Sequence, residues 1–215
     1  MLKYRVIPVT PYQQNCSLIW CDNTLEAAVI DPGGELDRIL AVANEEKVNL
    51  KAIWLTHGHI DHVGGTASLA KSHKLPIIGP HQDDLFWLQS IDQQAQMMGW
   101  TAVEGFTPSR WLSDGETLQL GQLSFQVLHC PGHTPGHVVF YEPEASLAFV
   151  GDVLFAGSVG RTDFPRGNFD DLANSIRGKL WPLGDDVKFL PGHGPMSTFG
   201  HERKTNPFVA DHRFG

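Results

Sequence analysis

The apolar residues in the first part of the chain fall into short runs that turn-forming residues separate. Residues 2–9, 15–21 and 25–31 carry apolar side chains in the alternating or continuous patterns of half-buried and buried strands. Residues 31–34, with the sequence Asp-Pro-Gly-Gly, interrupt this pattern. Residues 36–43 then place leucine, isoleucine and alanine at helical spacing. This part of the chain therefore predicts three strands followed by a helix.

The next segment predicts one more strand and several helices. Residues 52–55 (Ala-Ile-Trp-Leu) form a continuous apolar run that is typical of a buried strand, and residues 65–73 predict a helix. Residues 81–111 are polar and aromatic, and they predict one or more helices. These helices either form the mouth of a functional site or simply cover the core, and the sequence alone supports both interpretations equally.

The second half of the chain has a similar order of elements. Residues 125–128, 138–141, 147–150 and 187–190 predict strands, and residues 170–179 predict a helix. Strands in both halves with helices between them favour two sheets packed face to face between helical layers. We find no linker-like stretch, so we predict an α/β protein with a single domain that spans residues 1–215.

Four short segments that follow predicted strands carry side chains that bind metals. The first is the segment 56–62, with the sequence Thr-His-Gly-His-Ile-Asp-His. Its histidine pair is spaced i, i+2 rather than the i, i+4 of helical zinc motifs, which places it on a loop past a strand end. Imidazole and carboxylate groups are ligands for zinc and neighbouring metals. The candidate ligands are His57, His59, Asp61, His62, His133, Asp152 and His193.

These ligands are sufficient for two metal ions. One ion could take His57, His59 and His133. A second ion could take Asp61, His62 and His193. Asp152 has two oxygens and could bridge the two ions, which in such sites lie roughly 3.5–4 Å apart and share a water or hydroxide. Asp61 and Asp152 would then be the catalytic carboxylates, acting as ligands that orient the shared hydroxide.

Other interpretations of these residues fit the sequence less well. A structural zinc site is closed by four ligands and is commonly rich in cysteine, whereas this set has seven donors. Cys130 precedes His133 by three residues, and we interpret it as a buried thiol rather than a ligand. We interpret His137 as a packed strand residue; the alternative is that it supports a metal ligand. Five further histidines show no ligand spacing: His73, His81, His129, His201 and His212.

The segment 56–62 and its later partners resemble the metallo-β-lactamase superfamily, and most closely its glyoxalase II-like hydrolases, including small single-domain forms. The resemblance extends to residues 151–155 (Gly-Asp-Val-Leu-Phe), 160–164 (Gly-Arg-Thr-Asp-Phe) and 202–208 (Glu-Arg-Lys-Thr-Asn-Pro-Phe). It implies an αββα four-layer sandwich with the metals at one edge between the sheets. It also implies the same seven ligands that the spacing indicates.

The resemblance further implies a reaction and its cofactors. Glyoxalase II enzymes hydrolyse the thioester S-D-lactoylglutathione to D-lactate and glutathione, a step of methylglyoxal detoxification. We therefore expect a metal-dependent thioester hydrolase with two divalent ions. Zinc is the first choice, and iron or manganese also suits the nitrogen and oxygen ligands. Arg161 stands where the family has a substrate-binding lysine, so it is a candidate contact for a substrate carboxylate.

Two departures from the family bear on substrate binding. Full-length members carry a C-terminal helical region with basic residues that hold glutathione, and we expect most of that region to be absent after residues 206–208. A tyrosine that touches glutathione in the family is also missing, because Gly194 and Pro195 follow His193. We therefore expect weakened glutathione binding.

Three other functions remain open. Persulfide dioxygenases, which use a single iron and act on glutathione persulfide, share a stretch like residues 160–164, although the pair Gly194-Pro195 fits hydrolases better. Another hydrolase of this fold, such as a lactonase or a β-lactamase, is a second possibility. A partner-binding domain without activity is the third, and the seven intact ligands argue against it.

Composition and charge narrow the choice of partner and compartment. The formal net charge of −8 argues against broad binding to nucleic acid. The three cysteines show no disulfide framework, which indicates a reducing compartment. There is neither a signal-peptide pattern nor an apolar run of about 18 residues. We therefore expect a cytoplasmic enzyme with a small-molecule partner, a glutathione thioester, no membrane contact, and a monomeric or small homo-oligomeric state.

Overall fold

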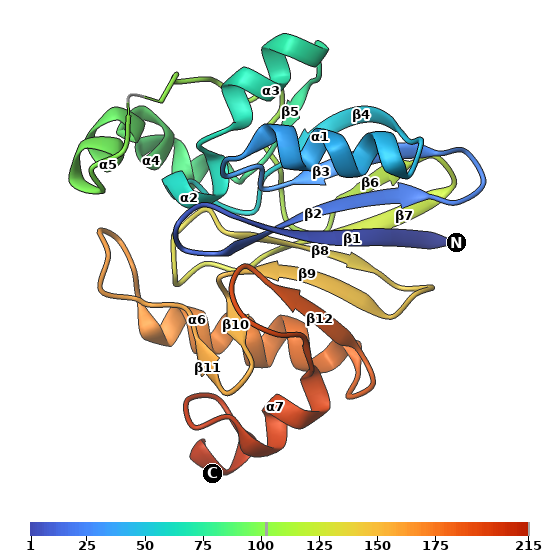
Figure 1. Cartoon of the computed structure of the whole chain (residues 1–215). Coiled ribbons are helices and arrows are strands. Elements are labelled where there is room, and N and C mark those ends of the chain that lie inside the picture. The colour runs from blue at the N-terminus through green and yellow to red at the C-terminus, as the bar shows by residue number, and fades with distance from the viewer. Residues whose placement is uncertain (102, 215) are drawn as a thin grey trace.

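The computed structural model describes residues 1–101 and 103–214, which form two large β-sheets packed face to face (Figure 1). The first sheet has five strands in the order β1-β2-β3-β4-β5. The strands β1, β2 and β3 run antiparallel, whereas β4 and β5 continue parallel to β3. Their bounds are β1 Leu2–Val9, β2 Gln14–Cys21, β3 Glu26–Ile30, β4 Asn49–Trp54 and β5 Ile77–Ile78.

The second sheet has six strands in the order β13-β12-β9-β8-β7-β6. Strand β12 runs parallel to β9, and the other neighbours are antiparallel. A separate two-stranded ribbon, β10 with β11, follows β9. The bounds are β6 Thr117–Leu120, β7 Leu123–His129, β8 Val138–Glu142, β9 Leu147–Gly151, β10 Leu154–Phe155, β11 Ser158–Val159, β12 Lys188–Pro191 and β13 Ser197–Thr198.

Helices cover the outer face of each sheet, so the predicted αββα four-layer sandwich is confirmed (Figure 1). Helices α1 (Leu36–Glu45) and α3 (Thr66–His73) pack on the first sheet. Helices α6 (Phe169–Ser175) and α7 (Phe199–Thr205) pack on the second, and a π-helical turn, η2 (Ile176–Leu180), continues α6. The remaining helices are α2 Ile60–Val63, η1 Gln82–Asp84, α4 Leu85–Gln89, α5 Ile91–Met97, η3 Trp181–Leu183 and η4 Asp211–Arg213.

The main core lies between the two sheets. The ring of Trp54 from β4 packs edge-on against Phe125 from β7, with centroids 5.0 Å apart, and lies 5.2 Å from the ring of Phe140 in β8. All three side chains are almost fully buried. Burial of a large apolar side chain contributes roughly 1.5–3 kcal/mol. This shared core fixes the sheets against each other and thereby aligns their strand ends.

The predicted strands and helices agree with the structure, and the segment 81–111 contains the expected helices in its first part. This segment is helical only from η1 to α5, and its remaining described residues run irregularly back to β5, where Arg110 forms an isolated bridge with Ile78. Gly99, Gly105 and Pro108 explain why no helix continues there. No helix in the described ranges is long and apolar enough to cross a membrane.

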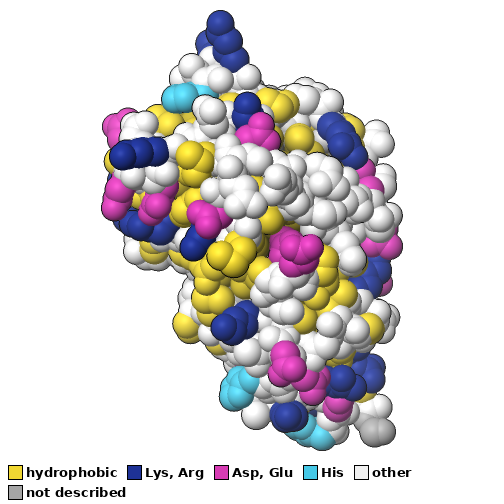
Figure 2. All heavy atoms as spheres, turned by 90° about the vertical axis from the view of Figure 1, so that its right-hand side faces the viewer, with side chains coloured by type: hydrophobic (Ala, Val, Ile, Leu, Met, Phe, Trp, Pro, Cys, Tyr) yellow, Lys and Arg dark blue, Asp and Glu magenta, His cyan; other side chains and the backbone are white. Residues whose placement is uncertain are grey.

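One face of the molecule carries both signs of charge. Figure 2 shows the side at the right of Figure 1, where lysine and arginine side chains lie scattered among acidic ones rather than in a single cluster. Apolar side chains gather across the middle of this face. The metal-binding side chains lie elsewhere, at the edge where α2, α4 and α5 meet the loops of the second sheet (Figure 1).

Candidate metal centre

Four strands deliver the predicted ligands to one edge of the sandwich. The loop after β4 carries His57 and His59, and the one-turn helix α2 carries Asp61 and His62. The other three side chains follow β7, β9 and β12, which lie in the second sheet. The structure thus brings all seven predicted side chains together, although they come from segments more than 130 positions apart in the sequence.

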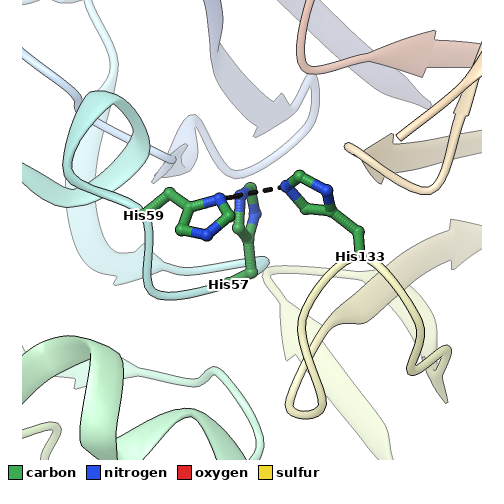
Figure 3. A group of neighbouring side chains, drawn as sticks. All are labelled: His57, His59 and His133. Carbon is green, nitrogen blue, oxygen red and sulfur yellow. Dashed lines mark hydrogen bonds between the residues drawn. The ribbon is translucent and has the colours of Figure 1, made fainter. Parts of the chain in front are cut away.

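Three histidines form the first group of possible metal ligands. His59 Nδ1 lies 3.2 Å from His57 Nε2 and 3.0 Å from His133 Nε2. Figure 3 shows the three rings pointing toward one another from two separate loops. Ligands held roughly 2.0–2.1 Å from a tetrahedral ion lie roughly 3.3–3.4 Å from one another. The observed separations therefore suit one metal ion at the centre of the group.

The second group combines a carboxylate with two imidazoles. Asp61 Oδ2 lies 3.1 Å from His193 Nε2 and 3.7 Å from His62 Nε2. Asp152 lies between the two groups, with Oδ1 3.3 Å from His62 Nε2 and Oδ2 3.5 Å from His133 Nε2. The arrangement is the one expected for two neighbouring ions with Asp152 between them.

Two buried atoms, one in the second group and one in Asp152, have no hydrogen-bond partner among the described residues. They are His62 Nε2 and Asp152 Oδ1. Buried polar atoms are nearly always partnered, and an ion between these two would satisfy both. Gly192 keeps the space beside them open, because a Cβ at that position would lie 2.1 Å from Asp152 Oδ1 and 2.7 Å from His62 Cε1. The residues present therefore fit a metal ion.

Asp31 orients the ligands of both groups. Its carboxylate accepts hydrogen bonds from the Thr56 backbone N–H at 2.8 Å, the Thr56 hydroxyl at 2.5 Å and His62 Nδ1 at 2.8 Å. The hydroxyl of Thr56 in turn lies 3.0 Å from His57 Nδ1. The Nδ1 atoms of His57 and His62 thus donate hydrogen bonds away from the centre. This leaves the Nε2 atom of each ring free to bind a metal. The sequence analysis took Asp31 only as part of a turn, because its partners lie 25 or more positions away.

Backbone carbonyls orient two more ligands in the same way. His133 Nδ1 lies 2.7 Å from the carbonyl oxygen of Arg161, and His193 Nδ1 lies 3.2 Å from that of Tyr12. A carbonyl oxygen can only accept, so each Nδ1 carries the proton and each Nε2 faces the centre with a lone pair. Four of the five candidate histidines therefore have the tautomer that metal ligands need.

Burial and neighbouring charge keep the first group of ligands and Asp152 in metal-binding forms, whereas burial of His62 and His193 is outweighed by the carboxylates around them, which raise the pKa of both imidazoles. Burial, followed by the nearby histidines, holds the pKa of His57 well below its usual range, and burial together with His133 lowers the pKa of His59 to about 3. Burial opposes ionisation of Asp152, but His62 outweighs it and lowers the pKa of that carboxyl. The first group therefore offers neutral imidazoles, and Asp152 is an anion. Both are the forms that coordinate metals.

Asp84 links the two loops that carry the first group. Its buried carboxylate accepts hydrogen bonds from Gly58 N–H at 2.8 Å, Gly136 N–H at 2.6 Å and the Thr134 hydroxyl at 2.8 Å. Burial raises the pKa of Asp84 to about 6, although all three donors favour its ionised form. The sequence analysis did not single out Asp84, which stood among other polar residues of the segment 81–111.

His137 contacts the metal-binding residues directly, which corrects its interpretation as a packed strand residue. Its Nε2 accepts a hydrogen bond from the Asp152 backbone N–H at 3.0 Å, and its ring stacks on His57 with centroids 4.6 Å apart. It lies just before β8, where it contacts both Asp152 and His57. Cys130 belongs to neither group, and burial raises the pKa of its thiol to about 12.

A further group of possible donors lies outside the centre. His81, Asp83 and His129 offer ligand atoms within 4.8 Å of one another, a grouping that their sequence spacing did not reveal. The two imidazoles stack nearly parallel, with centroids 4.1 Å apart and an angle of 18° between the rings. The Nε2 of His129 also bonds to the carbonyl oxygen of Pro135 at 2.7 Å. Stacked rings direct their nitrogens side by side, so this group is a poor metal site.

An apolar pocket of about 740 Å³ opens above the metal-binding residues. Helices α4 and α5 form one wall, and residues 161–165 form the opposite wall. Aromatic rings and methionines predominate, among them Phe86, Trp87 and Phe164. Arg161 also lines the pocket, but Asp163 binds its guanidinium at 2.9 and 2.8 Å, so the candidate substrate contact already has a carboxylate partner.

Comparison with known proteins identifies the family. Residues 9–193 match the family model of the metallo-β-lactamase superfamily. The chain belongs to the metallo-β-lactamase superfamily. This membership implies divalent metals at the His/Asp centre, which agrees with the ligand geometry.

Similar proteins in this superfamily have both known and unknown activities. A protein from Haemophilus influenzae named hydroxyacylglutathione hydrolase GloC is 48% identical, and the match covers 97% of this chain and 98% of that one. The crystal structure of the BLEG-1 B3 metallo-β-lactamase is 33% identical with a TM-score of 0.88, covering 96% and 99% of the two chains. A di-iron-bound structure, TTHA1623, is 39% identical with a TM-score of 0.87, covering 95% and 100%.

Proposed function

We propose that this chain is a metal-dependent thioester hydrolase that converts S-D-lactoylglutathione and water to D-lactate and glutathione. The observation that carries the proposal is the 48% identity, across almost the full length of both chains, with the protein named hydroxyacylglutathione hydrolase GloC. The convergence of seven metal-binding side chains below a substrate-sized pocket supports the same chemistry.

We infer that the centre holds two ions. His57, His59 and His133 would bind the first ion. Asp61, His62 and His193 would bind the second. Asp152 would contact both ions. Zinc suits tetrahedral nitrogen and oxygen ligands, and iron is the main alternative because a similar protein was solved in a di-iron-bound form.

The chain's own residues would orient and shield the reaction. When bound, the ions make a water nucleophilic at neutral pH and polarise the carbonyl that it attacks. Asp61 and Asp152 stay ionised, and both line the pocket, so they can accept hydrogen bonds from a water at the centre and fix its direction. Trp87 and Phe164 pack edge-on beside His59 and exclude bulk water from the acyl group.

The first prediction concerns metal content. Protein prepared with excess zinc or iron should contain close to two ions per chain by elemental analysis, because both groups of ligands are complete. The Asp61→Asn variant should fall toward one ion, since it weakens only the second group. One ion in the wild type, with the ligands of the second group turned away in a metal-loaded crystal, would favour the single-iron dioxygenase instead.

The second prediction concerns thioester turnover. We expect measurable kcat on S-D-lactoylglutathione but a KM toward about 1 mM, the upper end of common values. The described lining of the pocket is mostly apolar and its arginine, Arg161, is already paired with Asp163, so the glutathione arm gains few charge contacts. Weak binding that is equal in ground and transition states raises KM without lowering kcat.

Steady-state kinetics on zinc- and iron-loaded protein provide the test. The Arg161→Ala variant should change KM by less than about twofold, because Asp163 already neutralises its charge. No thioester turnover with either metal would refute the proposed function. Oxygen consumption with glutathione persulfide, measured on the same samples, would identify a dioxygenase.

The proposed reaction also suggests the cellular setting. A glutathione thioester hydrolase acts where glutathione is abundant, and the described cysteines, Cys16, Cys21 and Cys130, are all free thiols. We therefore infer a cytoplasmic enzyme of methylglyoxal detoxification, built as one domain over residues 1–215. The small-molecule substrate needs no second chain, so a monomer or small homo-oligomer would suffice.

A further inference from the structure

The loop after β11 contributes Arg161, Phe164 and Pro165 to the pocket lining and runs from the metal centre to α4. Near its start, the ring of Phe164 packs edge-on against His59, with centroids 4.9 Å apart, and against His133 at 5.8 Å. Two residues later, the guanidinium carbon of Arg166 lies 4.3 Å from the ring centroid of Phe86 in α4. Phe86 and Pro165 both line the pocket, so Arg166 lies next to residues of the pocket lining.

Arg166 differs from Arg161 in having an unused charge. Arg161 is held by Asp163 through two hydrogen bonds. Arg166 is exposed, and within residues 1–101 and 103–214 it takes part in no ion pair and no side-chain hydrogen bond. Its guanidinium rests only on the face of Phe86, a contact that leaves its N–H donors free at the edge. It is therefore an available cation beside the pocket.

The backbone at Arg166 is also unusual for an arginine. Its φ angle is +62°, in the left-handed region that glycine and asparagine adopt more easily. The turn is closed by a hydrogen bond from Gly167 N–H to the carbonyl oxygen of Phe164 at 2.8 Å. This turn fixes the backbone from which the Arg166 side chain extends over Phe86.

We propose that Arg166 binds a carboxylate of the substrate on the arm remote from the reacting carbonyl, and so makes the chain prefer anionic thioesters over neutral ones. This inference rests on the proposed thioester hydrolase. A guanidinium binds a carboxylate through two parallel N–H donors, and stacking on Phe86 holds its plane in place before the substrate arrives. Glutathione carries carboxylates at both ends of its peptide, several bonds from the thioester.

The expected contribution is modest and salt-dependent. An ion pair at an exposed site changes binding by roughly three- to fivefold at low ionic strength and by less as salt screens the charges. The remote carboxylate stays bound throughout the reaction, so its loss should raise KM and leave kcat little changed. These features distinguish a binding contact from a general defect of the fold.

The test compares two substrates in matched variants. S-D-lactoylglutathione carries carboxylates, whereas S-lactoyl-N-acetylcysteamine has the same thioester and none. Arg166→Gly should raise KM for the glutathione thioester by roughly three- to fivefold but leave KM for the neutral thioester unchanged. Its melting temperature should be equal or higher, because glycine relieves the positive φ. Arg166→Lys should restore part of the effect, since it keeps the charge without the planar fork.

A remote arginine serves as the control, and direct binding supplies a second readout. Arg38→Ala on α1 changes net charge equally and should leave KM for both substrates as in the wild type. Calorimetry with S-hexylglutathione, which is not hydrolysed, should show roughly three- to fivefold weaker binding to Arg166→Gly in 0.05 M salt, and a smaller difference in 0.5 M salt. This measurement does not depend on catalysis.

The outcomes separate the two proposals. Equal KM increases on both thioesters, or unchanged KM and unchanged S-hexylglutathione binding in Arg166→Gly, would overturn the role of Arg166. Absence of wild-type turnover on both thioesters would instead refute the proposed function, and the binding measurement would still decide whether Arg166 holds a carboxylate.

Discussion

The Asp152→Ala variant should lose roughly a thousandfold in kcat/KM, whereas the His137→Ala variant should lose roughly 10–100-fold. The two oxygens of Asp152 face ligands of both groups, His62 at 3.3 Å and His133 at 3.5 Å. In the proposed two-ion centre, removing them would take a shared ligand from both ions. His137 is not one of the seven predicted ligands; its Nε2 accepts a hydrogen bond from the Asp152 backbone N–H, and its ring stacks on His57. Loss of the His137 side chain should change the orientation of Asp152 and His57 but leave all seven ligands in the chain.

Kinetics and elemental analysis on the same samples separate these two roles. Asp152→Ala should purify with clearly less than the wild-type metal content, and added metal should not restore its activity. His137→Ala should regain part of its activity as metal is raised, because all seven ligands remain. The exposed His201 on α7 provides a histidine control that should behave as the wild type. Equal losses in Asp152→Ala and His137→Ala, with metal fully retained in the latter, would contradict this ranking.

The fold and the proposed ligands were predictable because their information is local. Strand runs such as 52–55 and 147–150 are continuous and apolar, and each is followed by its metal-binding residues within a few positions. Strand ends in two packed sheets meet at shared edges, so side chains placed just past them converge. Strand β6 and helix α7 were not predicted, and neither were the strands β5, β10, β11 and β13, because two residues carry no periodic pattern.

The residues that orient the ligands were not predictable, because their partners are distant in the chain. Asp31 reaches Thr56 and His62 across 25 and 31 positions, and nothing around it indicates those contacts. Arg161 was a reasonable substrate contact by its place in the motif, but its pairing with Asp163 depends on the loop conformation. His137 was not predictable for the same reason. Its spacing fits a strand, and its contact with the Asp152 backbone N–H forms only in the folded sheet.

Replacing Asp84 with alanine should lower the free energy of unfolding by about 4 kcal/mol, a large part of the stability of a typical domain. Three buried or partly buried donors, from Gly58, Thr134 and Gly136, would lose their acceptor, and each unsatisfied donor costs roughly 1–3 kcal/mol. The same loss separates the loop of His57 and His59 from that of His133, so metal affinity should fall as well. Asp84→Asn, which keeps one oxygen but adds donors that face Gly58 or Gly136, should lie between alanine and the wild type.

Urea unfolding of the metal-free variants measures the first effect, and zinc titration of the folded variants measures the second. Asp83→Ala is the matched control, because it removes the same charge one residue earlier from a side chain that is 57% exposed. It should change the free energy of unfolding by less than about 0.5 kcal/mol. If Asp84→Ala were as stable as this control, the carboxylate would not be what joins the two loops. If it were less stable but bound zinc as tightly as the wild type, Asp84 would support the fold without setting the positions of His57, His59 and His133.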